Sequence, residues 1–275
     1  IDDILAELRS RGMITLAPFG FSFAAIPEER NRQYASREQE LSAMATRCYE
    51  CLKSKRMSPT GLFKILQIAL NKPDDVTKEY FTTSQEALDF CLQTNDNRGA
   101  TDICKSVDKK LLGLLASAKT PEARTACARF LNTLHLKTAQ ACFRLGDIAG
   151  AKTYLEQIDG VCDKIPEAQF RTGLASLPYY FLSAELACNE LRLLRTTGSR
   201  DDVNSQVTVC ESYTRQLENI LKIEEESRGI TPQTKLARAK IALVRIKIES
   251  GKSVLNLEAI GIQAESAKNL LENMP

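Results

Sequence analysis

The chain has 275 residues, of which 43% are hydrophobic and 26% charged, and this composition excludes a wholly disordered protein. Its 37 basic and 35 acidic residues leave a formal net charge of +2, so no global field favours nucleic acid or a membrane surface. The chain has only 13 glycines and 9 prolines, no tryptophan and 6% aromatic residues, which favours helix over sheet.

The amino-terminal segment predicts a helix followed by a loop. Residues 1–11 have the apolar spacing of a short amphipathic helix, which Gly12 closes. Residues 13–26 have no helical period and predict an extended apolar loop. We expect the part from Leu16 to Ile26 either to cap the first helices or to be an exposed docking element.

Helical periodicity continues from there to about residue 118. A long polar helix is predicted from Pro27 to about Arg56. Breaks rich in Pro, Asn and Asp separate the helices that follow. We expect these helices at residues 58–70, from a cap at Asp74 or Asp75 to about Leu92, and at residues 97–118.

The carboxyl-terminal half predicts a regular alternation of helices and short turns. The six helices are expected at about residues 121–145, 148–159, 166–195, 200–228, 232–250 and 254–273. The third is expected to kink near Pro178. Three successive units of helix, short turn and helix, with no convincing strand period, predict an antiparallel helical stack.

The helix over residues 235–248 favours stacked repeats over a compact bundle. Leu236 and Leu243 lie on one side of it, and Ile241 and Ile248 lie roughly 140–160° away at ~100° per residue. Two apolar faces on one helix indicate neighbouring helices on both sides, as in a repeat protein.

One segment resembles a known repeat. Residues 132–165 carry a small residue, Ala139, where two helices would cross, and Leu145-Gly146-Asp147 at the turn. Ala151 then opens the second helix, and Leu155 and Ile158 complete the apolar pattern. This pattern resembles one tetratricopeptide repeat (TPR), although His135 stands where the family has a bulky aromatic residue and the closing proline comes late, at Pro166.

The resemblance implies a binding surface. In repeats of this type, the first helix of each pair lines a concave groove. The match places five residues there: Thr133, Leu136, Gln140, Phe143 and Arg144. An exposed Phe143 beside Arg144 would anchor a peptide or a partner helix, and the alternative is that Phe143 packs on the preceding helix.

A basic run provides a second candidate surface. Five positive charges and no acidic residue fall between Lys235 and Lys247, and Arg238 and Arg245 lie one heptad apart on one side. We expect this ridge either to be a solvated face or to bind an acidic partner. Nucleic acid is a less favoured ligand, because no stacking aromatic residues accompany the run.

The catalytic motifs are weak. His135 is the single histidine, which excludes most designs based on a histidine pair or triad. Cys48 and Cys51 form one CxxC inside a helical pattern and are interpreted as packing residues. The segment Gly251-Lys252-Ser253 lacks the earlier glycine of a phosphate loop, so it is interpreted as a turn.

Cysteine usage predicts the compartment. Nine cysteines are an odd number with irregular spacing, which favours reduced thiols in the cytoplasm or nucleus. The longest uncharged run, residues 12–27, is too short and too broken to span a bilayer.

These observations predict an all-α, TPR-like superhelix (an α-solenoid) that forms one domain over residues 1–275, with residues 1–26 as a cap. We expect a non-enzymatic scaffold without a cofactor, part of a larger intracellular assembly, that binds another protein. The alternatives are a scaffold associated with nucleic acid or chromosomes, which would use the basic ridge, and an all-α ligand-binding protein or enzyme.

Overall fold

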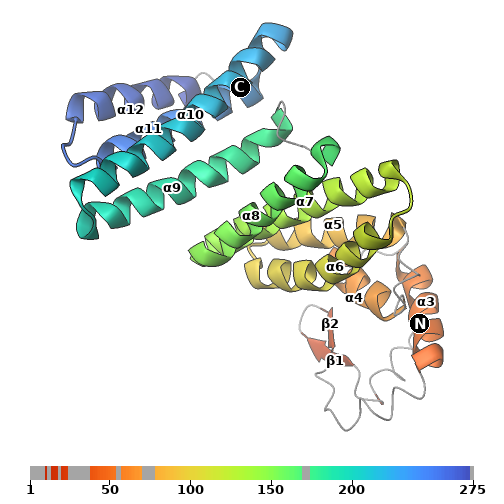
Figure 1. The fold of residues 1–275 in the computed structure, drawn as a ribbon. Helices are drawn as coiled ribbons and strands as arrows, with labels where there is room; N and C mark the ends of the chain where they lie inside the picture. The colour runs from red at the N-terminus through yellow and green to blue at the C-terminus, as the bar shows by residue number, and fades with distance from the viewer. Residues whose placement is uncertain are drawn as a thin grey trace. The chain divides into compact units, whose positions relative to one another are not determined.

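The computed structural model describes Ser10 and residues 14–17, 20–23, 38–53, 57–69, 78–168 and 174–272 (Figure 1). The chain divides into two compact units, residues 1–119 and residues 120–275. The predicted helix at residues 1–11, apart from Ser10, and the cap at Asp74 or Asp75 lie outside the described residues. A single domain over residues 1–275 stays a prediction.

The described residues of the first unit form a short hairpin and four helices. The helices are α3 (Glu38–Leu52), α4 (Pro59–Ala69), α5 (Lys78–Gln93) and α6 (Asn97–Ser117). Within this unit, α3 packs on α4, α4 on α5 and α5 on α6. The start predicted for the first of these helices, at Pro27, lies outside the described residues.

The hairpin corrects the prediction of a loop at residues 13–26. Strands β1 (Ile14–Ala17) and β2 (Gly20–Phe23) pair antiparallel, with Ile14 opposite Phe23 and Ala17 opposite Gly20. β-branched and aromatic residues favour strands, and a four-residue strand is too short to give a clear period. The role of Leu16–Ile26 as a cap stays a prediction.

The second unit consists of helices in sequence-adjacent pairs. These helices are α7 (Pro121–Arg144), α8 (Ile148–Lys164), α9 (Leu177–Thr197), α10 (Arg200–Arg228), α11 (Pro232–Gly251) and α12 (Leu257–Glu272). α7 packs on α8, α9 on α10, and α11 on α12, while α11 also contacts α9 and α10. The described part of the chain is therefore helical apart from the hairpin, as predicted, and the superhelix stays a prediction.

Helix starts follow the capping residues in the sequence. The side chain of Thr120 accepts a hydrogen bond from the N–H of Ala123, at 3.2 Å, and Ser199 forms a reciprocal capping box with Asp202. The kink predicted near Pro178 is wrong. Pro178 lies in the first turn of α9, where a missing N–H costs nothing, and two short 3₁₀ turns (Pro166–Ala168 and Leu174–Ser176) precede it.

The structure contains two copies of one helix–turn–helix unit, 51 residues apart. In α5–α6 the turn carries Asn95 at φ 58°, and in α7–α8 it carries Gly146 at φ 79°. The next residue, Asp96 or Asp147, caps the second helix by accepting from the N–H three residues later, at 2.9 Å in both copies. Buried residues also correspond pairwise: Tyr80 and Leu131, Leu88 and Ala139, Cys91 and Cys142, Ala100 and Ala151, Val107 and Ile158.

The core that positions the candidate site lies between α9, α10 and α11. Leu191, Leu217 and Val244 are all at most 1% exposed and belong to one apolar cluster. α11 approaches α9 closely at Gly251, where a Cβ atom would lie 2.6 Å from the Leu191 side chain. Arg195 also donates to the carbonyl oxygen of Ser250, at 2.6 Å, so the two helices are held together at this end.

Candidate functional site

The second unit has an open concavity of about 890 Å³, which we call the apolar groove. Its walls come from the end of α7, the start of α9, and α11, together with the 3₁₀ turn before α9. The residues lining it are Gln140, Phe143, Arg144, Leu174, Leu177, Pro178, Phe181, Leu182, Glu185, Gln233, Leu236, Ala237, Lys240, Leu243, Ile246 and Lys247. Every contributing helix is thus the first member of its pair.

α11 contributes an apolar row and a cationic row to this groove. Leu236 and Leu243 remain 40% and 48% exposed, although leucine is usually buried. Lys240 and Lys247 lie beside them and are exposed. The expectation of neighbouring helices on more than one side of α11 is confirmed, because it contacts α9, α10 and α12. The two apolar faces nevertheless differ: Ile241 and Ile248 are buried in the core, whereas the face with Leu236 and Leu243 is left half-exposed.

α9 forms the facing wall. Phe181 is half-buried there, and the Nζ atom of Lys240 lies 5.8 Å from the centre of its ring. Lys247 forms an ion pair with Glu185, the one acidic side chain among the lining residues. Three cationic side chains, including Arg144 on α7, therefore face a single carboxylate in the groove.

The structure separates the groove residues expected from the repeat resemblance. Gln140, Phe143 and Arg144 line the apolar groove together. Leu136 instead belongs to the apolar core formed with α8 and α9, and the hydroxyl of Thr133 donates back to the carbonyl oxygen of Arg129, at 3.0 Å. Phe143 is half-buried: it lines the groove and also packs against that same core of α7, α8 and α9. The alternative that it packs on the preceding helix stays a prediction.

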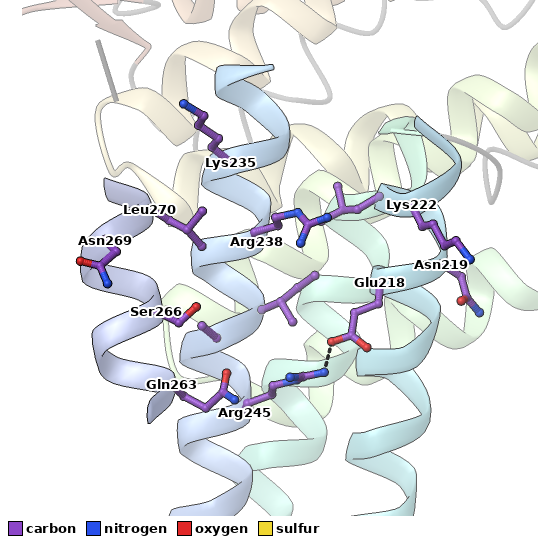
Figure 2. Close-up of a pocket in the computed structure, with 13 residues that line it drawn as sticks. Glu218, Asn219, Lys222, Lys235, Arg238, Arg245, Gln263, Ser266, Asn269 and Leu270 are labelled. Atoms are coloured by element: carbon purple, nitrogen blue, oxygen red, sulfur yellow. Dashed lines mark hydrogen bonds and ion pairs between the residues drawn. The ribbon is translucent and has the colours of Figure 1, made fainter. Parts of the chain in front are cut away.

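A second concavity of about 1060 Å³, the polar pocket, lies on another side of α11, against α10 and α12. Arg238 and Arg245 project into it from α11, while Gln263 and Ser266 face it from α12 (Figure 2). Lys222 and Lys235 also line it. The other two predicted binding residues, Arg238 and Arg245, are thus separated from the groove that Phe143 and Arg144 line.

Acidic residues of α10 hold both arginines. Arg238 donates through Nε to Glu225, at 2.7 Å, and also through Nη2. This hydrogen bond lowers the pKa of the Glu225 carboxyl and raises the pKa of the Arg238 guanidinium. Arg245 donates to Glu218 through Nη2 alone, as the dashed line in Figure 2 marks. These pairs connect α10 to α11.

The basic ridge is therefore not one surface. Lys240 and Lys247 lie in the apolar groove, while Lys235, Arg238 and Arg245 line the polar pocket. The helical period separates the two groups by more than 100°. Glutamates from α9 and α10 form ion pairs with Lys247, Arg238 and Arg245.

Sequence reasoning missed the wall contributed by α9. Leu177, Pro178 and Phe181 line the groove, but Pro178 was expected to kink a longer helix. The sequence did carry a signal for this wall. Proline is common in the first turn of a helix, so Pro178 indicates a helix start at Leu177. A helix that starts there places Phe181, four residues later, on the same side as Leu177.

Among the residues of the weak catalytic motifs, His135 and Cys48 are buried, but Cys51 is not, so its interpretation as a packing residue is wrong. His135 is 2% exposed, and its ring centre lies 5.5 Å from that of Tyr154. Cys48 is buried, and burial raises the pKa of its thiol, whereas Cys51 is exposed. Among the residues that the structure describes, no cluster of three or more His, Cys, Asp or Glu side chains could hold a metal ion.

No family model, curated protein or solved structure matches the chain. In the described part of the chain, none of the helices has both the length and the apolar character needed to cross a bilayer.

Proposed function

We propose that the chain is a non-catalytic, TPR-like helical-repeat scaffold that binds a segment of another protein in the apolar groove. The observation that supports this proposal most directly is the groove itself, in which half-exposed leucines and a phenylalanine lie beside cationic side chains. Apolar anchors surrounded by polar side chains are typical of protein interfaces.

Two features support the repeat interpretation. The groove is lined by α7, α9 and α11, the first helices of three successive pairs, which is the surface that TPR-like proteins use. The copy of the α7–α8 turn in α5–α6 extends the local pattern beyond the segment at residues 132–165. In this proposal the pairs continue as a right-handed superhelix.

The alternative of a nucleic-acid scaffold receives less support. Nucleic-acid binding is driven by Lys and Arg side chains that neutralise phosphates and release the counterions condensed on them, whereas Arg238 and Arg245 are already paired with Glu225 and Glu218. The two groups of basic side chains also face different sides of α11.

An unbiased peptide selection tests the proposal. A displayed random library would be selected against the full 275-residue chain, and enriched peptides would be measured on Leu243→Asp. We expect at least a tenfold loss of affinity, of the order of 1.4 kcal/mol, because the carboxylate would be buried against apolar partner atoms.

Leu193→Asp is the matched control. Leu193 is 60% exposed on α9 and does not line the groove. Binding that survives Leu193→Asp and is lost in a folded Leu243→Asp would support the proposal. A selection that enriches nothing, or peptides that bind both variants equally, would contradict it.

A further inference from the structure

The side chains that α11 presents to the apolar groove repeat every seven residues. Leu236 is followed by Leu243, and Lys240 by Lys247, so each row advances by about 10.5 Å, or two helical turns. Ile246 follows Leu243 by three residues and also lines the groove. In the heptad notation abcdefg, the two leucines take position a, Ile246 takes position d and the two lysines take position e. This is the arrangement of a coiled-coil seam.

This spacing selects the conformation of the partner. An α-helix returns a side chain to the same face after seven residues, or about 10.5 Å, which equals the spacing of the two leucines. An extended strand repeats its face every two residues, or about 6.6 Å, and therefore falls out of register with them. The seam thus favours a helix lying along α11.

The charge of the groove selects the partner's polar edge. Lys240 and Lys247 follow the apolar row on one side, and Arg144 lies across the groove on α7. Glu185 is the one carboxylate among the lining residues, so the lining has an excess of two positive charges. In coiled coils, the residues that flank the seam choose the partner by charge.

We infer that the occupant of the apolar groove is an amphipathic α-helix whose apolar stripe packs on Leu236, Leu243 and Phe181, and whose flanking positions carry Asp or Glu beside Lys240 and Lys247. This inference rests on the proposed function and specifies its partner class. The partner helix spans about two heptads, the length over which α11 presents the seam.

Three synthetic helical peptides of three heptads test it by fluorescence anisotropy with the full chain. The acidic peptide has Leu at the a and d positions and Glu at e and g. The basic peptide replaces every Glu by Lys, and the broken peptide is the acidic one with a central proline, which interrupts the helix. Each would be measured at two salt concentrations, because rim charges are screened.

The charge test uses Lys240→Glu/Lys247→Glu, with Lys222→Glu/Lys268→Glu as the control of equal charge change. Lys222 and Lys268 are exposed and lie outside the groove. We expect the natural chain and the control to bind the acidic peptide about tenfold more tightly than the basic one, and the groove variant to reverse that order. Circular dichroism and thermal melting would check folding, and Lys240→Glu alone is the milder variant if the double one unfolds.

Each outcome decides the inference. A reversed preference together with loss of the broken peptide supports it. Equal binding of acidic and basic peptides, or equal binding of the broken peptide, overturns it. The designed helical peptides could fail to bind while the unbiased selection enriches extended peptides whose binding requires Leu243. That result would overturn the inference of a helical partner and leave the proposed function standing. If both experiments fail, the proposed function falls with it.

Discussion

The two open sides of α11 carry the same kind of charge in different settings. On the side of the polar pocket, Arg238 and Arg245 are each bound to a glutamate of α10. On the side of the apolar groove, Lys240 lies over an aromatic ring and Lys247 meets Glu185, while two leucines beside them stay exposed. One side connects neighbouring helices, and the other presents apolar surface to solvent.

The difference shows that a run of basic residues does not define a surface. All five positive charges lie within 13 residues, yet the helical period distributes them over two sides, and neighbouring helices decide which are paired. Exposed leucine, a residue that folding normally buries, distinguishes the groove from the pocket.

The largest expected effect contrasts the core side of α11 with the groove side. Ile248→Ala removes a side chain that is 3% exposed and should lower the free energy of unfolding by about 2–4 kcal/mol. Leu243→Ala should cost about 1 kcal/mol or less, because half of that side chain is already in water. Urea denaturation followed by circular dichroism measures both. Equal losses would mean that the groove side is covered.

A smaller effect concerns the contact that sets the spacing of α9 and α11. Gly251→Ala places a methyl group 2.6 Å from Leu191, which is fully buried and has no room to move, so we expect a loss of about 1–3 kcal/mol. Gly261→Ala in α12 meets no atom within 4 Å and should stabilise the protein by about 0.5–1 kcal/mol. Thermal melting compares the two, and a stable Gly251→Ala would show that the helices can separate.

The smallest expected effect concerns the side of α11 on which Arg238 and Arg245 are paired with glutamates. Glu225→Gln should lower the free energy of unfolding by about 0.5–1 kcal/mol at neutral pH. The folded-state pKa of Glu225 lies below its ordinary value of 4.5, so its stabilising effect is complete above that pH and is lost as pH falls through the lowered pKa. The difference in unfolding free energy between the natural chain and the variant should therefore begin to shrink as pH falls below about 4.5, and should vanish only below the lowered folded-state pKa.

Glu226→Gln is the control for this pair. Glu226 is exposed and forms an i, i+4 pair with Lys222, whose Nζ atom lies 3.9 Å from its Oε1 atom. We expect almost no difference from the natural chain at any pH. A pH-independent deficit in Glu225→Gln would show that the pair with Arg238 is not what stabilises this side.

The helices were predictable because their signals are local. Thr120-Pro121, Gly198-Ser199 and Thr231-Pro232 mark helix starts by capping chemistry, and each is found where the sequence placed it. The hairpin at residues 14–23 was missed, because two four-residue strands give too few residues for a period. The fragment at residues 132–165 placed Gln140, Phe143 and Arg144 in the groove, and no spacing along the sequence could show which glutamates bind Arg238 and Arg245.

The copy of the repeat unit in α5–α6 was also missed. Its turn uses Asn95 where the other copy has Gly146, and its core uses Tyr80 where the other has Leu131. Few identical residues remain, but the spacing from Cys91 to Asp96 equals that from Cys142 to Asp147. Burial at corresponding positions, which only the structure gives, makes the correspondence clear.

The packing of each helix mainly on its sequence neighbours has a kinetic consequence. Contacts between residues close along the chain need little loop closure, so chains of this kind have a low contact order and fold quickly for their size. Local opening is expected to differ along the chain, and amide hydrogen exchange would report this difference helix by helix. α12 is expected to exchange early, because Ala267 is the one buried side chain among its described residues, whereas α11 belongs to the core shared with α9 and α10.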